Sequence, residues 1–375
     1  MTSFRGAALC SWIPWILSIT SPWCIQLIHG FHGFHGSFAR RVELHVHLDG
    51  SMDSTDLFDI CKNRGLELPG IGVPQSSSDV KHFVEGFSGW HRFDAVNEIL
   101  GGDVKSIQLA AEAFVGFQAK SGVQYTEVRY DPVRLSHSKL ANMSISEEDA
   151  VRAVQEGLRV GSVRHQVAVY QILCAMRGSS PQQCFNTANL ALKLSSQDMG
   201  GVVGLDLAGD ETDFPNAAYI DCMRHAKHAG LNVTVHSGEF NTTQADDVRS
   251  AVFSMHADRV GHGYAAAQDP QLLIELRQRG VHLEACPNSA LRHGPWALKA
   301  IKSFKNQVLF GLNTDDPAPL FGNTTAEADE AIVEGLNFSR EDIHGAYEAA
   351  FRARFGARDV TSLMTSLAEG ASLHV

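Results

Sequence analysis

Short apolar segments rich in β-branched residues alternate with longer segments of helical periodicity over most of the chain. Strands that are apolar throughout are typical of a parallel sheet whose crossovers are helices. The predicted strands are residues 42–47, 124–130, 167–174, 202–207, 232–236, 259–262, 281–286 and 308–312, and predicted helices include residues 106–120, 147–160, 216–229 and 270–279. Eight such units predict an α/β fold of the (β/α)8 TIM-barrel type rather than an open sheet.

The body of the chain, residues 39–375, is longer than the roughly 250 residues typical of this barrel. The excess lies mainly in residues 50–100, directly after the first strand, and in the C-terminal helices. An insertion at that place predicts a helical lid over the barrel mouth. Phe83 and Phe87 share one face of a predicted short helix, where they either cover the mouth or pack in the core.

Residues 1–38 differ in character from the rest of the chain. Residues 6–38 contain no Lys, Arg, Asp or Glu, and such an apolar start after Arg5 is typical of a signal peptide or a membrane anchor. Pro14 and Pro22 would interrupt a spanning helix, so we expect no stable membrane insertion. We therefore expect a signal-like or disordered extension at 1–38 before one domain at 39–375. The expected location is the cytoplasm, with secretion or membrane anchoring as the alternative if residues 1–38 act as a signal.

The composition is that of an enzyme-sized protein with a large core, because 44% of residues are hydrophobic and 19% are charged. A formal net charge of −11 argues against nucleic acid as a partner and favours a small molecule. We expect a monomer. The seven cysteines show no paired CxxC spacing, so we expect buried free thiols in a reducing compartment.

Polar residues follow several of the predicted strands. His45 and His47 are two positions apart in a strand, so both imidazoles project from one face. The carboxyl ends of barrel strands meet at one mouth, where active sites of this fold lie. Three histidines and a carboxylate there suit zinc with one position open for water. The polar residues at the strand ends are His45, His47, His236, Glu239, His262, Asp315 and Asp316.

These segments, in order from about residue 41 to at least residue 320, resemble the adenosine deaminase family. The resemblance lies in residues 45–50 (HVHLDG), 126–130 (TEVRY), 205–211 (LDLAGDE), 235–239 (VHSGE), 259–264 (RVGHGY) and 312–317 (LNTDDP). It implies a zinc-dependent barrel of purine metabolism that hydrolyses adenosine and 2′-deoxyadenosine to the inosine form and ammonia.

The same resemblance implies a role for each matching residue. The ligands of one zinc ion would be His45, His47, His236 and Asp315. The catalytic residues would be Glu239, which protonates purine N1, His262, which assists the attacking water, and Asp316, which hydrogen-bonds that water and N7. The remaining substrate contacts would be His47, Asp49 at the ribose, the Gly209 backbone at N3, and Phe83 and Phe87 in the lid. Burial is expected to raise the pKa of Glu239 so that it can act as an acid near neutral pH.

Other activities stay open. Residues 285–289 differ from the commonest vertebrate form, and related enzymes deaminate adenine or N6-modified adenylate. Residues 207–211 favour the nucleoside enzyme, and a phosphorylated substrate would need an extra Lys or Arg near the mouth. A binuclear amidohydrolase would usually need a carboxylated lysine after the fourth strand, and residues 205–207 contain none. A secreted growth-factor-like or inactive relative is the other alternative, although no metal ligand is lost.

Overall fold

Eight parallel strands form one sheet in the computed structural model, which describes residues 41–318 and 325–357. The strand order is β1-β2-β5-β6-β7-β8-β9-β10, so each strand pairs with the next one along the chain apart from a small two-stranded hairpin. The fold prediction is confirmed, and the strand boundaries differ from the predicted ones by one or two residues. The barrel strands are β1 Arg41–His47, β2 Val123–Tyr130, β5 Ala168–Met176, β6 Val202–Ala208, β7 Asn232–Ser237, β8 Arg259–His262, β9 His282–Ala285 and β10 Leu309–Leu312, and the hairpin strands are β3 His137–Ser138 and β4 Met143–Ser144.

The barrel closes between β1 and the segment that follows β10. The backbone N–H of His47 donates to the carbonyl of Asp315 at 2.9 Å, and the N–H of Asp315 donates to the carbonyl of His45 at 3.0 Å. The side-chain oxygen of Asn313 accepts from the backbone N–H groups of Leu44 and His45 at 2.7 and 3.1 Å. The seam of the barrel therefore runs through three of the predicted metal ligands.

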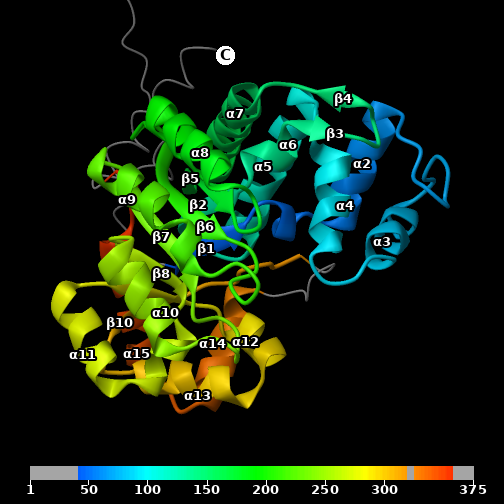
Figure 1. The fold of residues 1–375 in the computed structure, drawn as a ribbon. Coiled ribbons are helices and arrows are strands. Elements are labelled where there is room, and N and C mark those ends of the chain that lie inside the picture. Colours follow the sequence, from blue (N-terminus) through cyan, green and yellow to red (C-terminus); the bar gives the residue numbers. More distant parts are fainter. Residues whose placement is uncertain (1–40, 319–324, 358–375) are drawn as a thin grey trace, which may run out of the picture. The chain divides into compact units, whose positions relative to one another are not determined.

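Helices surround the strands (Figure 1). The helix of residues Pro270–Arg279 shows why the sequence predicts such elements well. Asp269 accepts a hydrogen bond from the Gln271 N–H at its start, proline occupies the first turn, and Gly280 ends it with φ of 73°. The helices are α2 Ser54–Arg64, α3 Ser77–Glu85, α4 His91–Leu100, α5 Val104–Lys120, α6 Pro132–Leu135, α7 Glu147–His165, α8 Pro181–Leu194, α9 Ile220–His228, α10 Ala245–Arg249, α11 Pro270–Arg279, α12 Pro287–His293, α13 Pro295–Phe304, α14 Ala326–Gly335 and α15 Arg340–Ala353.

The insertion after β1 forms α2, α3 and α4, which lie together on one side of the barrel in Figure 1. The predicted extension of residues 1–38 lies outside the described residues. Among the described helices, none has the length and apolarity needed to cross a membrane.

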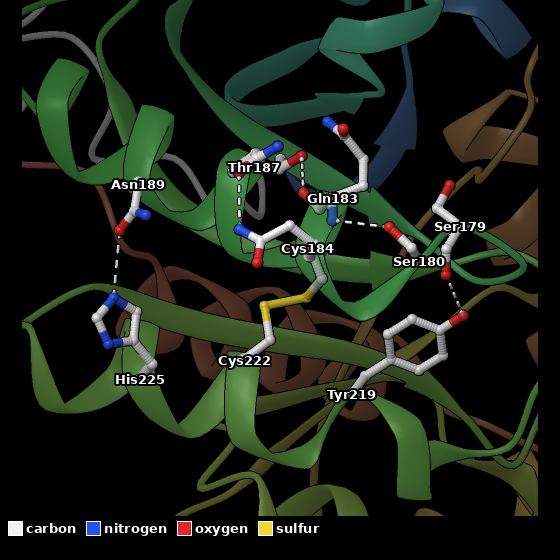
Figure 2. Close-up of a disulfide and its surroundings, with 11 residues drawn as sticks. Ser179, Ser180, Gln183, Cys184, Thr187, Asn189, Tyr219, Cys222 and His225 are labelled. Atoms are coloured by element: carbon white, nitrogen blue, oxygen red, sulfur yellow. Dashed lines mark hydrogen bonds between the residues drawn. A yellow bond between two sulfur atoms is a disulfide. The ribbon is translucent and has the colours of Figure 1, made fainter.

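One prediction about cysteine is wrong. Cys184 of α8 and Cys222 of α9 form a disulfide, which Figure 2 shows between the two helices. The two residues are 38 positions apart, and only the packing of neighbouring outer helices brings them together, so their spacing gives no warning. Cys61, Cys174 and Cys286 are buried free thiols, as expected.

Candidate active site

Four predicted ligands converge at the mouth of the barrel. His45 and His47 lie on β1, His236 lies near the end of β7, and Asp315 follows β10. The Nε2 atoms of His47 and His236 are 3.2 Å apart, and Oδ1 of Asp315 lies 3.4 Å from His45 Nε2 and 3.5 Å from His47 Nε2. Donor atoms of His45, His47 and His236 lie within 4.8 Å of one another, and so do those of His45, Asp315, His262 and Cys286.

Buried carboxylates hold two of these imidazoles from behind. His45 Nδ1 lies 2.8 Å from Glu284, and His236 Nδ1 lies 3.0 Å from Asp206. Arg129 of β2 joins both carboxylates, at 3.0 Å from Asp206 and 2.8 Å from Glu284. Burial would raise the pKa of Glu284, but Arg129 and Arg259 outweigh it and hold that pKa well below its usual range. An ionised carboxylate at Nδ1 directs the lone pair of Nε2 toward the cluster.

The cluster fits a metal ion better than it fits hydrogen bonding within the protein. His45 Nε2 is fully buried and has no hydrogen-bond partner of good geometry in the described part of the chain. Two imidazole nitrogens facing each other at 3.2 Å, as in His47 and His236, can pair only if one carries a proton. Buried polar atoms normally have partners, and a tetrahedral nitrogen and oxygen donor set is typical of zinc. These four residues could therefore hold one such ion.

Glu239 lies on the loop after β7, and a second glutamate fixes that loop. Glu211 accepts from the backbone N–H of Gly238 at 2.9 Å and of Glu239 at 2.6 Å. The Glu239 carboxylate lies between two imidazoles, 3.6 Å from His262 Nε2 and 3.1 Å from His293 Nε2. The expected rise of its pKa is wrong in this structure. Burial raises the pKa, but His262 and His293 outweigh burial and lower it to about 2.

Asp316 and Asp49 lie beside the cluster. Oδ1 of Asp316 is buried without a hydrogen-bond partner among the residues described, and burial together with the neighbouring Asp315 raises its pKa well above the usual value. A Cβ atom on Gly50 would lie 1.9 Å from that oxygen, so only glycine lets the chain pass Asp316 there. Asp49 accepts a hydrogen bond from Asn97 of α4 at 2.6 Å.

Two of these residues have an unusual backbone. His262 and Asp315 adopt left-handed conformations with φ of 62° and 63°. Such a conformation costs of order 1–3 kcal/mol for a residue other than glycine, and it concentrates at functional sites.

A cavity of about 580 Å³, part of it open to solvent, lies over the cluster. Of the residues predicted to hold the metal, to bind substrate or to act on it, those that line the cavity are His47, Asp49, Gly209, His236, Glu239, His262, Asp315 and Asp316.

Comparison with known proteins decides the family. The sequence model described as adenosine deaminase matches residues 40–368. The chain belongs to the adenosine deaminase family. It is 33% identical over 322 residues to adenosine deaminase of Mus musculus, covering 80% of this chain and 88% of that one. It is 32% identical over 323 residues to adenosine deaminase of Gallus gallus, covering 80% and 87%.

Solved structures similar to this adenosine deaminase family member share its barrel. A zinc-bound amidohydrolase from Burkholderia ambifaria has a TM-score of 0.73 at 21% identity, covering 89% of this chain and 93% of that one. Adenine deaminase from Arthrobacter aurescens gives 0.72 at 20% identity, covering 89% and 100%. The N6-methyl-AMP deaminase of Arabidopsis thaliana gives 0.69 at 24% identity, covering 90% and 98%. At these identities the likeness shows the fold.

The aromatic residues at the cavity of this family member are not the expected ones. Trp90 and Phe93, at the start of α4, line the cavity, and Phe83 and Phe87 do not. The short helix α3 ends at Glu85, so Phe87 lies beyond it, and its ring instead contacts the ring of the buried Phe83 at 5.3 Å. The spacing of four residues is that of a helix face, but the helix ends too early to carry both residues to the mouth.

The wall of the cavity also carries a charged group that the sequence did not predict. Asp131 and Arg134, which follow β2, line it. Arg134 lies 2.7 Å from Asp94 and 3.5 Å from Asp131. The two acids neutralise the guanidinium. In the sequence, only the position of Asp131 and Arg134 directly after a barrel strand indicates that they lie at the cavity.

Proposed function

We propose that this protein hydrolyses the 6-amino group of adenosine and 2′-deoxyadenosine, giving inosine or 2′-deoxyinosine and ammonia, with one zinc ion per chain. One observation carries the proposal: His45, His47, His236 and Asp315 cluster at the barrel mouth, where His47, His236 and Asp315 line the same cavity as Glu239. Membership of the adenosine deaminase family supports the same reaction.

Each side chain of the site has its own role in this reaction. A zinc ion held by the four ligands would lower the pKa of water from about 15.7 to about 7, which makes water a nucleophile at neutral pH. His262 and Asp316 orient the attacking water and accept its proton. Attack at C6 moves electron density to N1, and Glu239 places a proton there. Asp49 binds the ribose, and the Gly209 backbone meets N3.

The charges lining the inner cavity favour a nucleoside over a nucleotide, whereas Arg92 and Arg292 line the adjoining hollow. A 5′-phosphate would need a free cation, and Arg134 on the cavity wall already has two carboxylate partners. Structures similar in fold include an adenine deaminase and an N6-methyl-AMP deaminase, so these activities are the second candidates.

One assay compares the candidates. The purified protein is expected to convert adenosine and 2′-deoxyadenosine faster than adenine or N6-methyl-AMP, followed by the change in ultraviolet absorbance. A chelator should abolish turnover, and added zinc should restore it. H236A should lose both turnover and bound metal, whereas the matched variant H225A, on the outer helix α9, should keep both. Faster turnover of adenine or N6-methyl-AMP would replace the proposed substrate, and no chelator-sensitive turnover of any of them would contradict the proposal.

We also propose a monomer, for which gel filtration is the test. For location, the two alternatives are the cytoplasm and an oxidising compartment. The disulfide between Cys184 and Cys222 favours the second, because cytosolic proteins rarely keep disulfides.

A further inference from the structure

A fifth histidine lies at the mouth of the barrel, and the resemblance assigns it no role. His293 is the last residue of α12, and its Nε2 lies 3.1 Å from Oε1 of Glu239. The Phe240 ring packs at right angles to the His293 ring, with the two centroids 5.1 Å apart. The imidazole is thus held on one side by a ring and on another by the proposed acid.

Two hollows meet at this contact. The inner hollow is the cavity over the metal ligands, and it includes Gly209 and His262 but not His293. The outer hollow is more open and is lined by Phe240, Arg292 and His293. Glu239 lines both hollows, as do Trp90, Phe93, Asp315 and Asp316, and among these five only Glu239 contacts His293 through a hydrogen bond in the described residues. A proton that enters from the outer side can therefore reach the inner side through the contact between His293 and Glu239.

The proposed reaction needs a proton at this place in every cycle. The reaction consumes no net proton: water loses two protons, of which one leaves on the ammonia and the other is released to solvent, while N1 of the inosine product gains one proton from Glu239. The water is deprotonated on the side of His262 and Asp316, whereas N1 is protonated from Glu239. The carboxyl group must therefore be reloaded after each turnover.

We propose, on the basis of the proposed deaminase function, that His293 reloads Glu239 with a proton from the outer hollow. The Nε2–H of His293 donates to Oε1 of the ionised Glu239 carboxylate and passes its proton to that oxygen, and the carboxyl group formed in this way gives the proton to N1. His293 then takes a new proton from solvent. His293 acts through Glu239, so it is a positioning and relay residue and makes no contact with substrate.

The charges around His293 suit this role. Burial lowers its pKa, but Glu239 and Asp315 outweigh burial, and also the opposing charge of Arg292, so that the pKa is raised above its ordinary value near 6.5. Arg92 and Asp316 line the same outer hollow. The proton is present below the raised pKa and is lost as the pH rises through it. Reloading should therefore slow as the pH rises through this raised pKa.

Two substitutions separate a relay from a purely structural contact. H293Q keeps a hydrogen-bond donor near Glu239 but cannot carry a proton, and H293F keeps only the ring that packs on Phe240. The relay predicts that both lower kcat roughly 100-fold, the lower end of general acid–base effects, with KM within a few-fold and bound metal unchanged. H225Q on α9 is the matched histidine control and should behave as wild type. Added imidazole should partly rescue H293A.

The pH profile and a titration complete the test. The alkaline fall of kcat in the wild type should be absent from H293Q. Nuclear magnetic resonance titration of His293 should give a raised pKa in the wild type and an ordinary one in E239Q, a readout that needs no turnover. If H293Q keeps wild-type kcat and the wild-type pH profile, the relay is overturned while the deaminase function stands. If the wild type deaminates no purine, the proposed function fails and the relay fails with it, whatever the titration gives.

Discussion

Glu211 illustrates how a single buried side chain can set the position of another. Its two carboxylate oxygens accept backbone N–H groups of the loop that carries Glu239, and one of them lies 2.6 Å from the Glu239 nitrogen. E211Q replaces one acceptor oxygen with an amide donor, which leaves a buried N–H unpaired at a cost of about 1–3 kcal/mol. We expect kcat to fall about 10-fold or more through a displaced Glu239, with metal content unchanged.

The matched control for this change is E156Q. Glu156 lies on the exposed face of α7 and pairs with Arg159 at 2.8 Å, so its loss should change neither kcat nor the unfolding midpoint measurably. Steady-state kinetics and metal analysis on both variants provide the comparison. Equal effects of E211Q and E156Q would remove the special role of Glu211.

At the residue scale, the sequence predicts which side chains meet but not their protonation. His45 and His47 share a strand face because side chains alternate along any strand, and the barrel ends bring His236 and Asp315 to them. The pKa of Glu239 depends on His293, which lies 54 positions further along the chain at the end of a helix. Such a contact is set by loop and helix geometry that no local pattern encodes.

At the scale of an element, α4 rather than α3 provides the aromatic wall of the cavity. Trp90 is 46% exposed and lines both the inner and the outer hollow, so a bound nucleoside would cover part of its ring. Removing that ring should cost about 1.4 kcal/mol of binding, which is a tenfold change. We therefore expect W90A to raise KM for adenosine about 10-fold, with little change in stability.

F87A is the matched control for W90A. Phe87 is exposed to a similar extent, 39%, but lies outside the cavity, so KM should stay at the wild-type value. A larger rise of KM in F87A than in W90A would instead support the pair predicted from spacing. Kinetics with adenosine on the two variants decide between them.

The elements themselves follow from the sequence where local signals agree. The strands are buried along nearly their whole length, and α11 starts with an Asp–Pro pair and ends at a glycine. The inserted helices α2, α3 and α4 are harder to predict from the sequence, because they are short and amphipathic and their contacts depend on tertiary packing. A spacing of four residues there predicts neighbours on a helix face, but not where the helix ends.

For the whole molecule, the covalent link between α8 and α9 is the feature with the largest expected effect on stability. The disulfide closes a loop of 38 residues between Cys184 and Cys222 on the outer ring of the barrel. A hydrogen bond lies close to the disulfide: the hydroxyl of Tyr219 donates to the backbone oxygen of Ser179 at 3.1 Å (Figure 2). The link therefore joins the first turns of α8 and α9, and neither cysteine lines the cavity over the metal ligands.

The disulfide gives a prediction in which stability and activity separate. A link across a loop of this length stabilises the folded chain by about 2–4 kcal/mol, chiefly by restricting the unfolded chain. We expect C184A/C222A to lower the free energy of unfolding by about that amount while kcat and KM for adenosine stay unchanged. Denaturant unfolding of the wild type should shift in the same direction on reduction, whereas the double variant should not respond to reductant. An equal response of both proteins to reductant would place its action at another cysteine, and alkylation with mass spectrometry would show whether Cys184 and Cys222 are bonded in the protein as isolated.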